Sequence, residues 1–385
     1  MIISNVKIHT MTTNDVIDNG YIYIKGKKIY DIGDMSTLNI KGEDIIDGNG
    51  LDVFPGFIDS HTHVGMFEDG LTFEGNDGNE ATEPITPHLR AIDAVNPSDR
   101  AFEEALNAGV TTVLTGPGSS NPIAGEFIAI KTHGKRIDKM LIKSPAAIKF
   151  ALGENPKNVY SEKNQAPCTR MSTAALIRES LFKARQYLLN KESSSGDNQP
   201  DYDIKGEALI PLLKRELPAH FHAHRADDMF TAIRISKEFN LRCVIIHSTE
   251  GHLIVDELLN EDVGLMSGPF LSDRSKPELK NLTPRSPGVM SNSGLNISIV
   301  TDHPVTPIQY LATCASLAVS EGMNEFDAIC AITINAARIC GIDDVVGTIE
   351  VGKDADFVFF SGSPLGINKK PKMVICNGNV INLDS

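Results

Sequence analysis

Short runs of alternating apolar and polar residues occupy both ends of the chain. Near the start, apolar and polar residues alternate over residues 2–8 and 20–25, and Gly and Asp residues punctuate these segments. The same pattern occurs near the end, over residues 346–349, 355–360 and 373–381. This pattern predicts antiparallel strands, and Asn377-Gly378 is typical of a hairpin turn. We therefore expect residues 1–50 and 345–385 to form one small β module together.

The middle of the chain alternates apolar runs with segments of helical periodicity. The runs cover residues 110–114, 146–150, 219–223, 242–246 and 297–300, and the helical segments cover residues 99–107, 173–189, 227–239 and 305–320. Such alternation over residues 51–344 predicts a parallel sheet with crossover helices, although periodicity does not say whether the sheet closes into a barrel. The polar stretch 191–203 interrupts the pattern and is predicted to be a solvated insertion.

Composition and charge narrow the functional classes. Charged residues make up 22% of the 385 residues and the formal net charge is -14, which disfavours nucleic acid and anionic membranes as partners. No apolar stretch approaches the ~20 residues of a membrane span, and the first residues lack the layout of a signal peptide, so we expect a cytoplasmic protein. Six cysteines without a Cys-x-x-Cys pair are expected to be reduced core residues.

Candidate metal ligands recur at the carboxyl ends of the predicted strands. His61 and His63 end the first apolar run, and because residues i and i+2 of a strand share one side, both imidazoles can reach one ion. A single His-x-His pair often occurs by chance in a loop, but five separate segments deliver such residues here. The others are Lys149 or Glu154, His222, His247 and Asp302. Nitrogen and carboxylate ligands without thiolate suit zinc, manganese or iron in a site left open for water.

The ordered motifs of the chain resemble those of the amidohydrolase superfamily. They are residues 55–63 (Pro-Gly-Phe-Ile-Asp-Ser-His-Thr-His), His222-Ala-His224, His247, Thr301-Asp302-His303 and residues 347–357 (Gly-Thr-Ile-Glu-Val-Gly-Lys-Asp-Ala-Asp-Phe). The resemblance implies an α/β fold, a TIM (β/α)8 barrel with a small β-sandwich formed by both termini, and one or two divalent metal ions, with zinc as the expected metal. It further implies that His61 and His63 bind the buried ion, that His222 and His247 bind the more exposed one, and that Asp302 binds metal and transfers the proton.

Two residues are candidates for the metal ligand from the fourth predicted strand. Lys149 resembles the lysine that many family members carry in a carboxylated form as a bridge between two ions, whereas Glu154 offers a ready carboxylate at the end of the strand. Lys149 could instead be an internal ion-pair partner, and Glu154 a turn residue or substrate contact. Asp302 also has a structural alternative, which is to cap a helix that starts at Pro304.

One departure from the family pattern bears on the reaction. Deaminases of the superfamily carry a Glu three residues after the strand-five His, and Arg225 stands there in this chain. This disfavours deamination and weakens an imidazolonepropionase-like cyclic amidase, which stays the alternative. The context of His222 and Lys149 is similar to that of Xaa-Pro and Xaa-Arg dipeptidase relatives, so we expect hydrolysis of a linear amide, an N-acyl amino acid or a dipeptide. A non-catalytic scaffold on the same fold usually loses ligands, and here every ligand position is filled.

Three further residues are candidates for substrate binding. His224 and Arg225 follow His222 on the same loop, and Arg170 could hold a carboxylate through its planar guanidinium. We therefore expect a small-molecule substrate that carries a carboxylate; a homo-oligomer is compatible with the sequence. The acidic segment 68–87 is long enough to fold over the mouth of a barrel, with a solvated loop as the alternative.

Overall fold

A separate mixed β-sheet is built from both ends of the chain. The computed structural model describes residues 1–39, 43–69, 72–194, 199–367 and 369–383. Within them the sheet follows the order β16-β15-β14-β5-β1-β2-β3, with β4 paired to β1. Its strands are β1 (Ile2–His9), β2 (Val16–Lys25), β3 (Lys28–Asp34), β4 (Ile45–Asp47), β5 (Asp52–Pro55), β14 (Phe357–Phe360), β15 (Met373–Cys376) and β16 (Asn379–Ile381). The two ends therefore cooperate as expected, and the sheet extends past residue 50 to Pro55.

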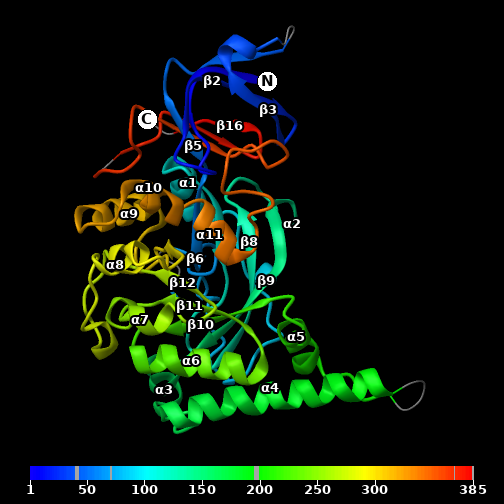
Figure 1. Cartoon of the computed structure of the whole chain (residues 1–385). Helices are drawn as coiled ribbons and strands as arrows, with labels where there is room; N and C mark the ends of the chain where they lie inside the picture. Colours follow the sequence, from blue (N-terminus) through cyan, green and yellow to red (C-terminus); the bar gives the residue numbers. More distant parts are fainter. Residues whose placement is uncertain (40–42, 70–71, 195–198, 368, 384–385) are drawn as a thin grey trace.

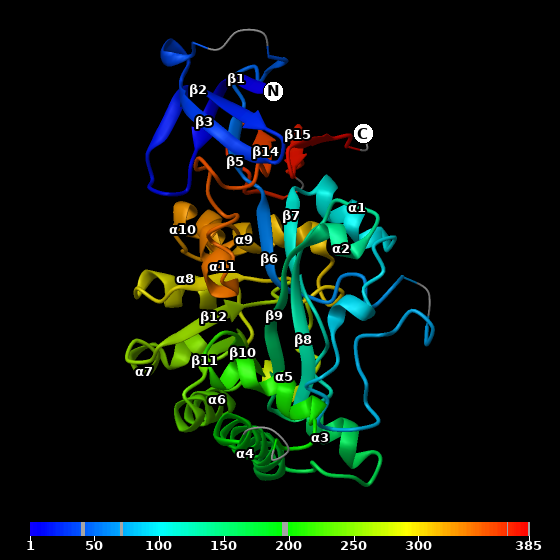
Figure 2. The ribbon, with the colours of Figure 1, turned by 90° about the vertical axis from the view of Figure 1, so that its right-hand side faces the viewer.

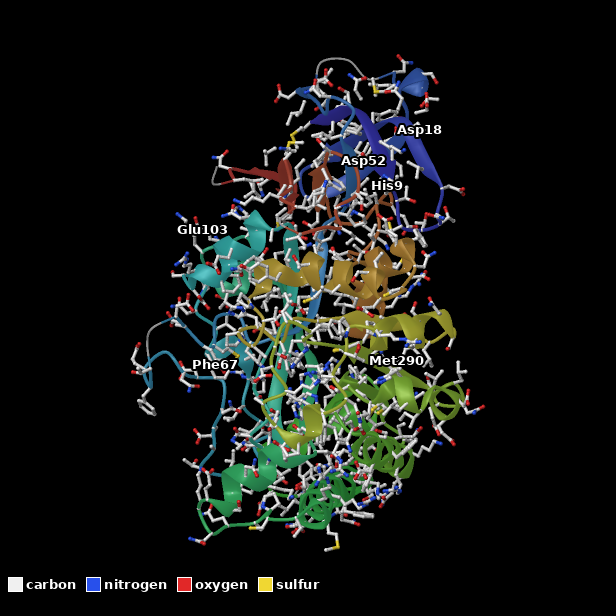
Figure 3. All side chains as sticks on the ribbon, turned by 90° about the vertical axis from the view of Figure 1, so that its left-hand side faces the viewer. His9, Asp18, Asp52, Phe67, Glu103 and Met290 are labelled. Atoms are coloured by element: carbon white, nitrogen blue, oxygen red, sulfur yellow. The ribbon has the colours of Figure 1, made fainter. Side chains whose placement is uncertain are left out.

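The joining of the two ends follows from the pairing of β5. This strand lies parallel to β1 on one side and antiparallel to β14 on the other, so residues from both termini meet across it. Apolar side chains from β1, β2 and β14 are buried together, among them Ile8, Ile22 and Phe357. Figure 3 labels His9 and Asp52 in this sheet, where the His9 Nε2 and Asp52 Oδ1 atoms lie 2.7 Å apart.

The second sheet is a near-closed barrel of eight strands. Its order is β13-β12-β11-β10-β9-β8-β7-β6. The strands are β6 (Phe57–Thr62), β7 (Val110–Thr115), β8 (Ile123–Lys131), β9 (Leu141–Ala151), β10 (Pro218–Ala223), β11 (Arg242–His247), β12 (Val263–Ser267) and β13 (Ile297–Ile299). The seam between β13 and β6 is joined by the hydroxyls of Ser60 and Ser298, 2.7 Å apart, and by the Asp302 N–H, which donates to the His61 carbonyl at 3.2 Å. The sheet thus nearly closes into a barrel, a point that periodicity left open.

The barrel differs from an all-parallel (β/α)8 arrangement at β8. This strand is antiparallel to both β7 and β9, whereas the remaining neighbours are parallel. The reason lies in the connections, because a parallel return needs a crossover of a dozen or more residues. Only residues 116–122 join β7 to β8 and residues 132–140 join β8 to β9, so the chain reverses at each.

Helices cover the outside of the barrel. They are α1 (Arg100–Asn107), α2 (Ile137–Met140), α3 (Glu154–Ser161), α4 (Arg170–Ser193), α5 (Ile204–Leu213), α6 (Ala226–Phe239), α7 (Val255–Leu258), α8 (Ser286–Asn292), α9 (Leu311–Ser320), α10 (Glu325–Ala331) and α11 (Ile334–Cys340). The predicted helix 305–320 begins only at Leu311, after a short turn at Ile308–Tyr310. None of the described helices is long and apolar enough to cross a membrane.

The terminal sheet and α4 lie at opposite ends of the molecule (Figures 1 and 2). Helix α4 continues into the predicted insertion as far as Ser193, and residues 195–198 of that insertion lie outside the described residues. Apolar strand side chains such as Ile58, Val244 and Met266 form one buried cluster with residues of α11. The candidate polar residues gather instead where the strands end.

Candidate metal centre

His61 and His63 meet a carboxylate at the seam of the barrel. His61 lies in the fully buried strand β6, and His63 directly follows the last residue of that strand. Because alternate residues of an extended chain share a side, both rings point the same way, and they are 0% and 7% exposed. Asp302 follows β13, and its Oδ1 lies 3.1 Å from the His61 Nε2 and 3.3 Å from the His63 Nε2. With bonds of ~2.1 Å, neighbouring ligand atoms on one zinc ion lie about 3.0–3.5 Å apart. Both separations from the Asp302 carboxylate are therefore in the range expected for ligand atoms that share an ion.

Asp302 does not cap a helix. Its φ of 54° places it in the left-handed region that Asp tolerates, and α9 begins only at Leu311. Backbone bonds hold the segment against β6, since the His63 N–H also donates to the His303 carbonyl at 2.9 Å. The structural alternative for Asp302 is therefore wrong, and its carboxylate is directed to the histidines by the closure of the barrel.

The buried Asp59 carboxylate links the backbone at His61 to the backbone at Thr301. Its carboxylate accepts hydrogen bonds from the Thr301 hydroxyl at 2.5 Å and from the backbone N–H groups of Thr301 and His61. Burial raises the pKa of Asp59 to about 7, although these hydrogen bonds lower it. The role of Asp59 was not predicted from the sequence, where the available signal was a carboxylate inside an apolar run.

His222 and His247 form the second pair. They end β10 and β11, which lie side by side, and the His247 Nε2 is 2.9 Å from the His222 Nδ1. The His247 Nδ1 lies 2.9 Å from the Gly268 carbonyl, and the His63 Nδ1 lies 2.7 Å from the Gly116 carbonyl. Each carbonyl accepts from an Nδ1–H, which leaves the Nε2 lone pair for a metal ion.

His224 belongs to the same cluster. Its ring stacks on His247 with centroids 4.3 Å apart, and its Nδ1 lies 2.7 Å from the Thr249 hydroxyl. Two groups of side chains bring their ligand atoms within 4.8 Å of one another: His222, His224 and His247, and His61, His247 and Asp302. The histidine cluster is consistent with binding of a divalent metal.

The electrostatics favour the protonation states that metal binding needs. Burial lowers the pKa of His61, His222 and His224 well below the usual value, and that of His247 to about 4. Burial alone raises the pKa of Asp302, but the neighbouring histidines, led by His247, hold it well below its usual range. The rings are therefore neutral and the carboxylate is ionised at neutral pH.

The two candidates from the fourth strand occupy different places. Lys149 is fully buried in β9, and its Nζ lies 3.4 Å from the His61 Nε2; burial lowers its pKa to about 7. Glu154 is the first residue of α3, and its backbone N–H donates to the Glu278 Oε2 at 3.2 Å. Lys149 lines the cavity over the histidines, whereas Glu154 is absent from the described lining.

The two candidate arginines are engaged with carboxylates. The Arg170 Nε lies 2.9 Å from the Asp228 Oδ1, and Arg225 pairs with both oxygens of Asp227 at 2.8 Å. Neither arginine is among the described residues that line the cavity over the histidines. The structure thus brings His224 to the candidate centre but leaves both guanidinium groups outside that lining.

A cavity of about 390 Å³ opens over the candidate ligands. Its walls include Phe67, which Figure 3 labels, together with Leu279 and Val305. A larger cavity of about 610 Å³ lies beside the segment that follows β6, and Asn79 lines both cavities. The predicted lid segment thus contributes Asn79 to the candidate site, and residues 70–71 of that segment lie outside the described residues.

A buried glutamate beside the histidines was not found from the sequence. Glu278 is 1% exposed, and its Oε1 lies 3.7 Å from the Nε2 atoms of both His222 and His224. Asn155, also overlooked, has its Nδ2 3.3 Å from the His222 Nε2. Both residues come from loops or helix starts without a periodic signal, so only the fold reveals them.

Comparisons with known proteins agree with the motifs. A family model described as "Amidohydrolase family" matches residues 215–381. The crystal structure of an amidohydrolase from Thermotoga maritima MSB8 covers 100% of both chains at 38% identity with a TM-score of 0.95. Amidohydrolase tasK of Hapsidospora irregularis is 29% identical over 87% of this chain, which spans only 37% of that protein. Imidazolonepropionase of Alkaliphilus oremlandii is 25% identical over 95% of this chain and 92% of its own length. Together with the geometry of the site, these findings show that the chain belongs to the amidohydrolase superfamily, as an enzyme with a histidine-rich metal site.

Proposed function

We propose that this metal-dependent hydrolase cleaves a linear amide C–N bond in a small molecule, an N-acyl amino acid or a dipeptide. The observation that carries the proposal is the position of Asp302. Its ionised carboxylate lines the cavity and lies within 3.3 Å of the ring nitrogens of His61 and His63. A group that moves a proton during hydrolysis must stand at this junction of ligands and substrate space.

The ligand roles follow the two pairs of rings. We assign His61, His63 and Asp302 to one divalent ion, and His222 and His247 to a second. Zinc is the expected metal because the donors are imidazole nitrogens and a carboxylate oxygen. When bound, the ion activates water and polarises the scissile carbonyl.

The residues of the chain itself then direct the proton. Asp302 accepts the proton of the attacking water and passes it to the departing nitrogen, which requires a carboxylate that stays ionised at neutral pH. The hydrogen bonds of His63 to Gly116 and of His247 to Gly268 hold the rings in one orientation. Apolar walls at Phe67 and Pro304 restrict water around the amide.

We assign the bridging role to Lys149 in preference to Glu154. Support comes from the 3.4 Å separation between the Lys149 Nζ and the His61 Nε2, and from the place of Lys149 in the cavity lining. A buried amine whose pKa is lowered toward 7 is partly neutral, and the neutral amine is the form that adds carbon dioxide. Glu154 is held instead at the start of α3.

The residue at position 225, an arginine, favours a linear amide over a deamination substrate. No carboxylate stands three residues after His222, and the guanidinium found there pairs with Asp227. Imidazolonepropionase activity is the second candidate, because proteins of that name are similar to this chain over nearly its full length.

The test is an assay of metal-loaded and chelator-treated protein on three substrate sets. These are N-acetyl amino acids and dipeptides, imidazolone propionate, and adenine as a deamination control. We expect release of free amino acid from the first set only, lost with the metal and restored by zinc. Ammonia release from adenine, or equal activity without metal, would overturn the proposal.

A further inference from the structure

The loop after β12 supplies one wall of the cavity. The loop residues that line the cavity are Pro269, Ser272, Asp273, Ser275, Lys276 and Leu279. Of the described lining residues, Lys149 and Lys276 carry an amine, and no arginine is present. Lys149 is fully buried beside His61, whereas the Lys276 side chain is 27% exposed. Lys276 is therefore the cation of this lining that a ligand can reach.

Lys276 is held in place by two contacts. Its Nζ lies 2.8 Å from the Glu278 Oε1 and donates to the Asn155 Oδ1 at 2.9 Å. Asn155 is fixed in turn, because its Nδ2 donates to the Ser119 hydroxyl at 2.7 Å. An ammonium group has three N–H donors, so one remains for a ligand. A long side chain that is already fixed loses little conformational entropy when it binds an anion.

Two carboxylates near Lys276, those of Glu278 and Asp273, differ in how they meet the cavity. Glu278 is 1% exposed, and its Oε1 lies 2.8 Å from the Lys276 Nζ. Glu278 is not part of the described lining, so a ligand meets the ammonium first. Asp273 does line the cavity, but it is solvent-exposed, where water and salt screen its charge.

Lys276 also stands at a suitable distance from the candidate metal ligands. The Glu278 Oε1 that lies 2.8 Å from the Lys276 Nζ is 3.7 Å from the His222 Nε2. The Lys276 Nζ is therefore at most 6.5 Å from the His222 Nε2. A carboxylate on the carbon next to a scissile nitrogen could reach it while the amide lies at the histidines.

We propose that Lys276 binds the carboxylate of the substrate and makes the enzyme selective for amides with a free carboxylate beside the scissile bond. This inference rests on the proposed linear-amide hydrolysis. It assigns to Lys276 the role that the sequence suggested for Arg170 and Arg225, which are paired with Asp228 and Asp227.

The experiment measures binding apart from turnover. N-methylsulfonyl-L-leucine, whose sulfonamide resists hydrolysis, and its C-terminal amide are titrated calorimetrically into metal-loaded protein; the leucine side chain suits the apolar walls at Phe67 and Leu279. We expect the acid to bind wild type at least ~10-fold more tightly than the amide, as for a charge-assisted hydrogen bond.

Three variants separate the charges. Lys276→Met should abolish or reverse the preference, because Glu278 then stands without its cation. Lys276→Met combined with Glu278→Gln removes both charges, so acid and amide should bind equally. Lys280→Met is the matched control, since Lys280 is exposed on the same segment and outside the described lining, and it should keep the wild-type ratio. Circular dichroism confirms that each variant is folded.

Two results would overturn the inference: no preference for the acid in wild type, including no binding of either probe, or a preference that survives Lys276→Met. Loss of the preference in Arg170→Met alone would assign the role to Arg170. Hydrolysis of N-acetyl-L-leucine is followed separately. Selective binding without hydrolysis would refute the proposed function and leave Lys276 as an anion site, whereas hydrolysis without selectivity would refute only the Lys276 assignment.

Discussion

Replacement of Asp302 by Asn is the most direct perturbation of the proposed chemistry. Asn has nearly the same shape, and like Asp it tolerates the left-handed backbone found at this position, where φ is 54°. The Asp302 N–H that donates to the His61 carbonyl is unaffected by the change. Ala would add roughly 1–2 kcal/mol of backbone strain at a positive φ, so Asn is the cleaner probe.

The expected magnitude follows from the role of the carboxylate. General acid–base catalysis contributes ~10²–10⁴-fold to a rate, and at 1.36 kcal/mol per tenfold this is about 2.7–5.4 kcal/mol on the barrier. The Asn amide cannot accept a proton at neutral pH. Because Asp302 also lies 3.1 and 3.3 Å from two ring nitrogens, weaker metal binding adds to the loss. We therefore expect kcat to fall by at least ~100-fold.

The assay combines steady-state hydrolysis of an N-acetyl amino acid with metal analysis by mass spectrometry and a thermal melt. A folded variant that keeps at least one equivalent of metal and loses turnover supports proton transfer by Asp302. Turnover within a few-fold of wild type would refute the reasoning. A variant without metal would show that Asp302 acts chiefly as a ligand, and added zinc should then restore turnover.

Three further predictions concern the metal, the bridge and pH. His61→Ala and His247→Ala should each lower the metal content and abolish hydrolysis; full activity in either variant would remove that residue from the centre. Lys149→Ala should lose metal and regain some activity with added short carboxylic acids, whereas Glu154→Ala should retain its metal; the reverse pattern would assign the bridge to Glu154. Burial lowers the pKa of His220 to about 3, so between about pH 6.5 and 3 the unfolded chain binds a proton that the folded chain excludes, and stability falls as pH falls. Urea unfolding of metal-free protein at pH 6.5 and 5.0 should therefore show that the free energy of unfolding falls less with pH in His220→Leu than in wild type, by up to ~1.4 kcal/mol per pH unit. An equal pH dependence in the two proteins would mean that His220 is protonated in the native state.

Local pattern was sufficient for part of the architecture. The parallel strands at residues 110–115, 218–223 and 242–247 appear where apolar runs predicted them, because a strand buried on both faces is largely apolar. Strands β8 and β12 were not predicted, and neither was the reversal of β8. Strand direction depends on the length and path of the connections, and an apolar run carries no information on either.

The candidate centre likewise combines features that the sequence predicts with features that depend on the tertiary structure. His61 and His63 share a side because of the two-residue period of a strand, which is local geometry and readable from the chain. The sequence also supplied the ligand types and the family motifs, and with them the class of enzyme. The meeting of Asp302 with these rings is different, since it requires closure of the barrel between β13 and β6.

Residues from loops depended wholly on the tertiary structure. Glu278 and Lys276 follow β12, and Asn155 lies in the first turn of α3, yet the three converge beside His222. Arg170 and Arg225 carried the stronger sequence signal for anion binding, but both are ion-paired outside the described cavity lining, whereas Lys276, which is also ion-paired, belongs to that lining. An ion pair depends on which opposite charge the fold brings within ~4 Å, and a sequence does not state that distance. The chain alone therefore determined the chemistry available, and the packing of loops decided which charges line the cavity.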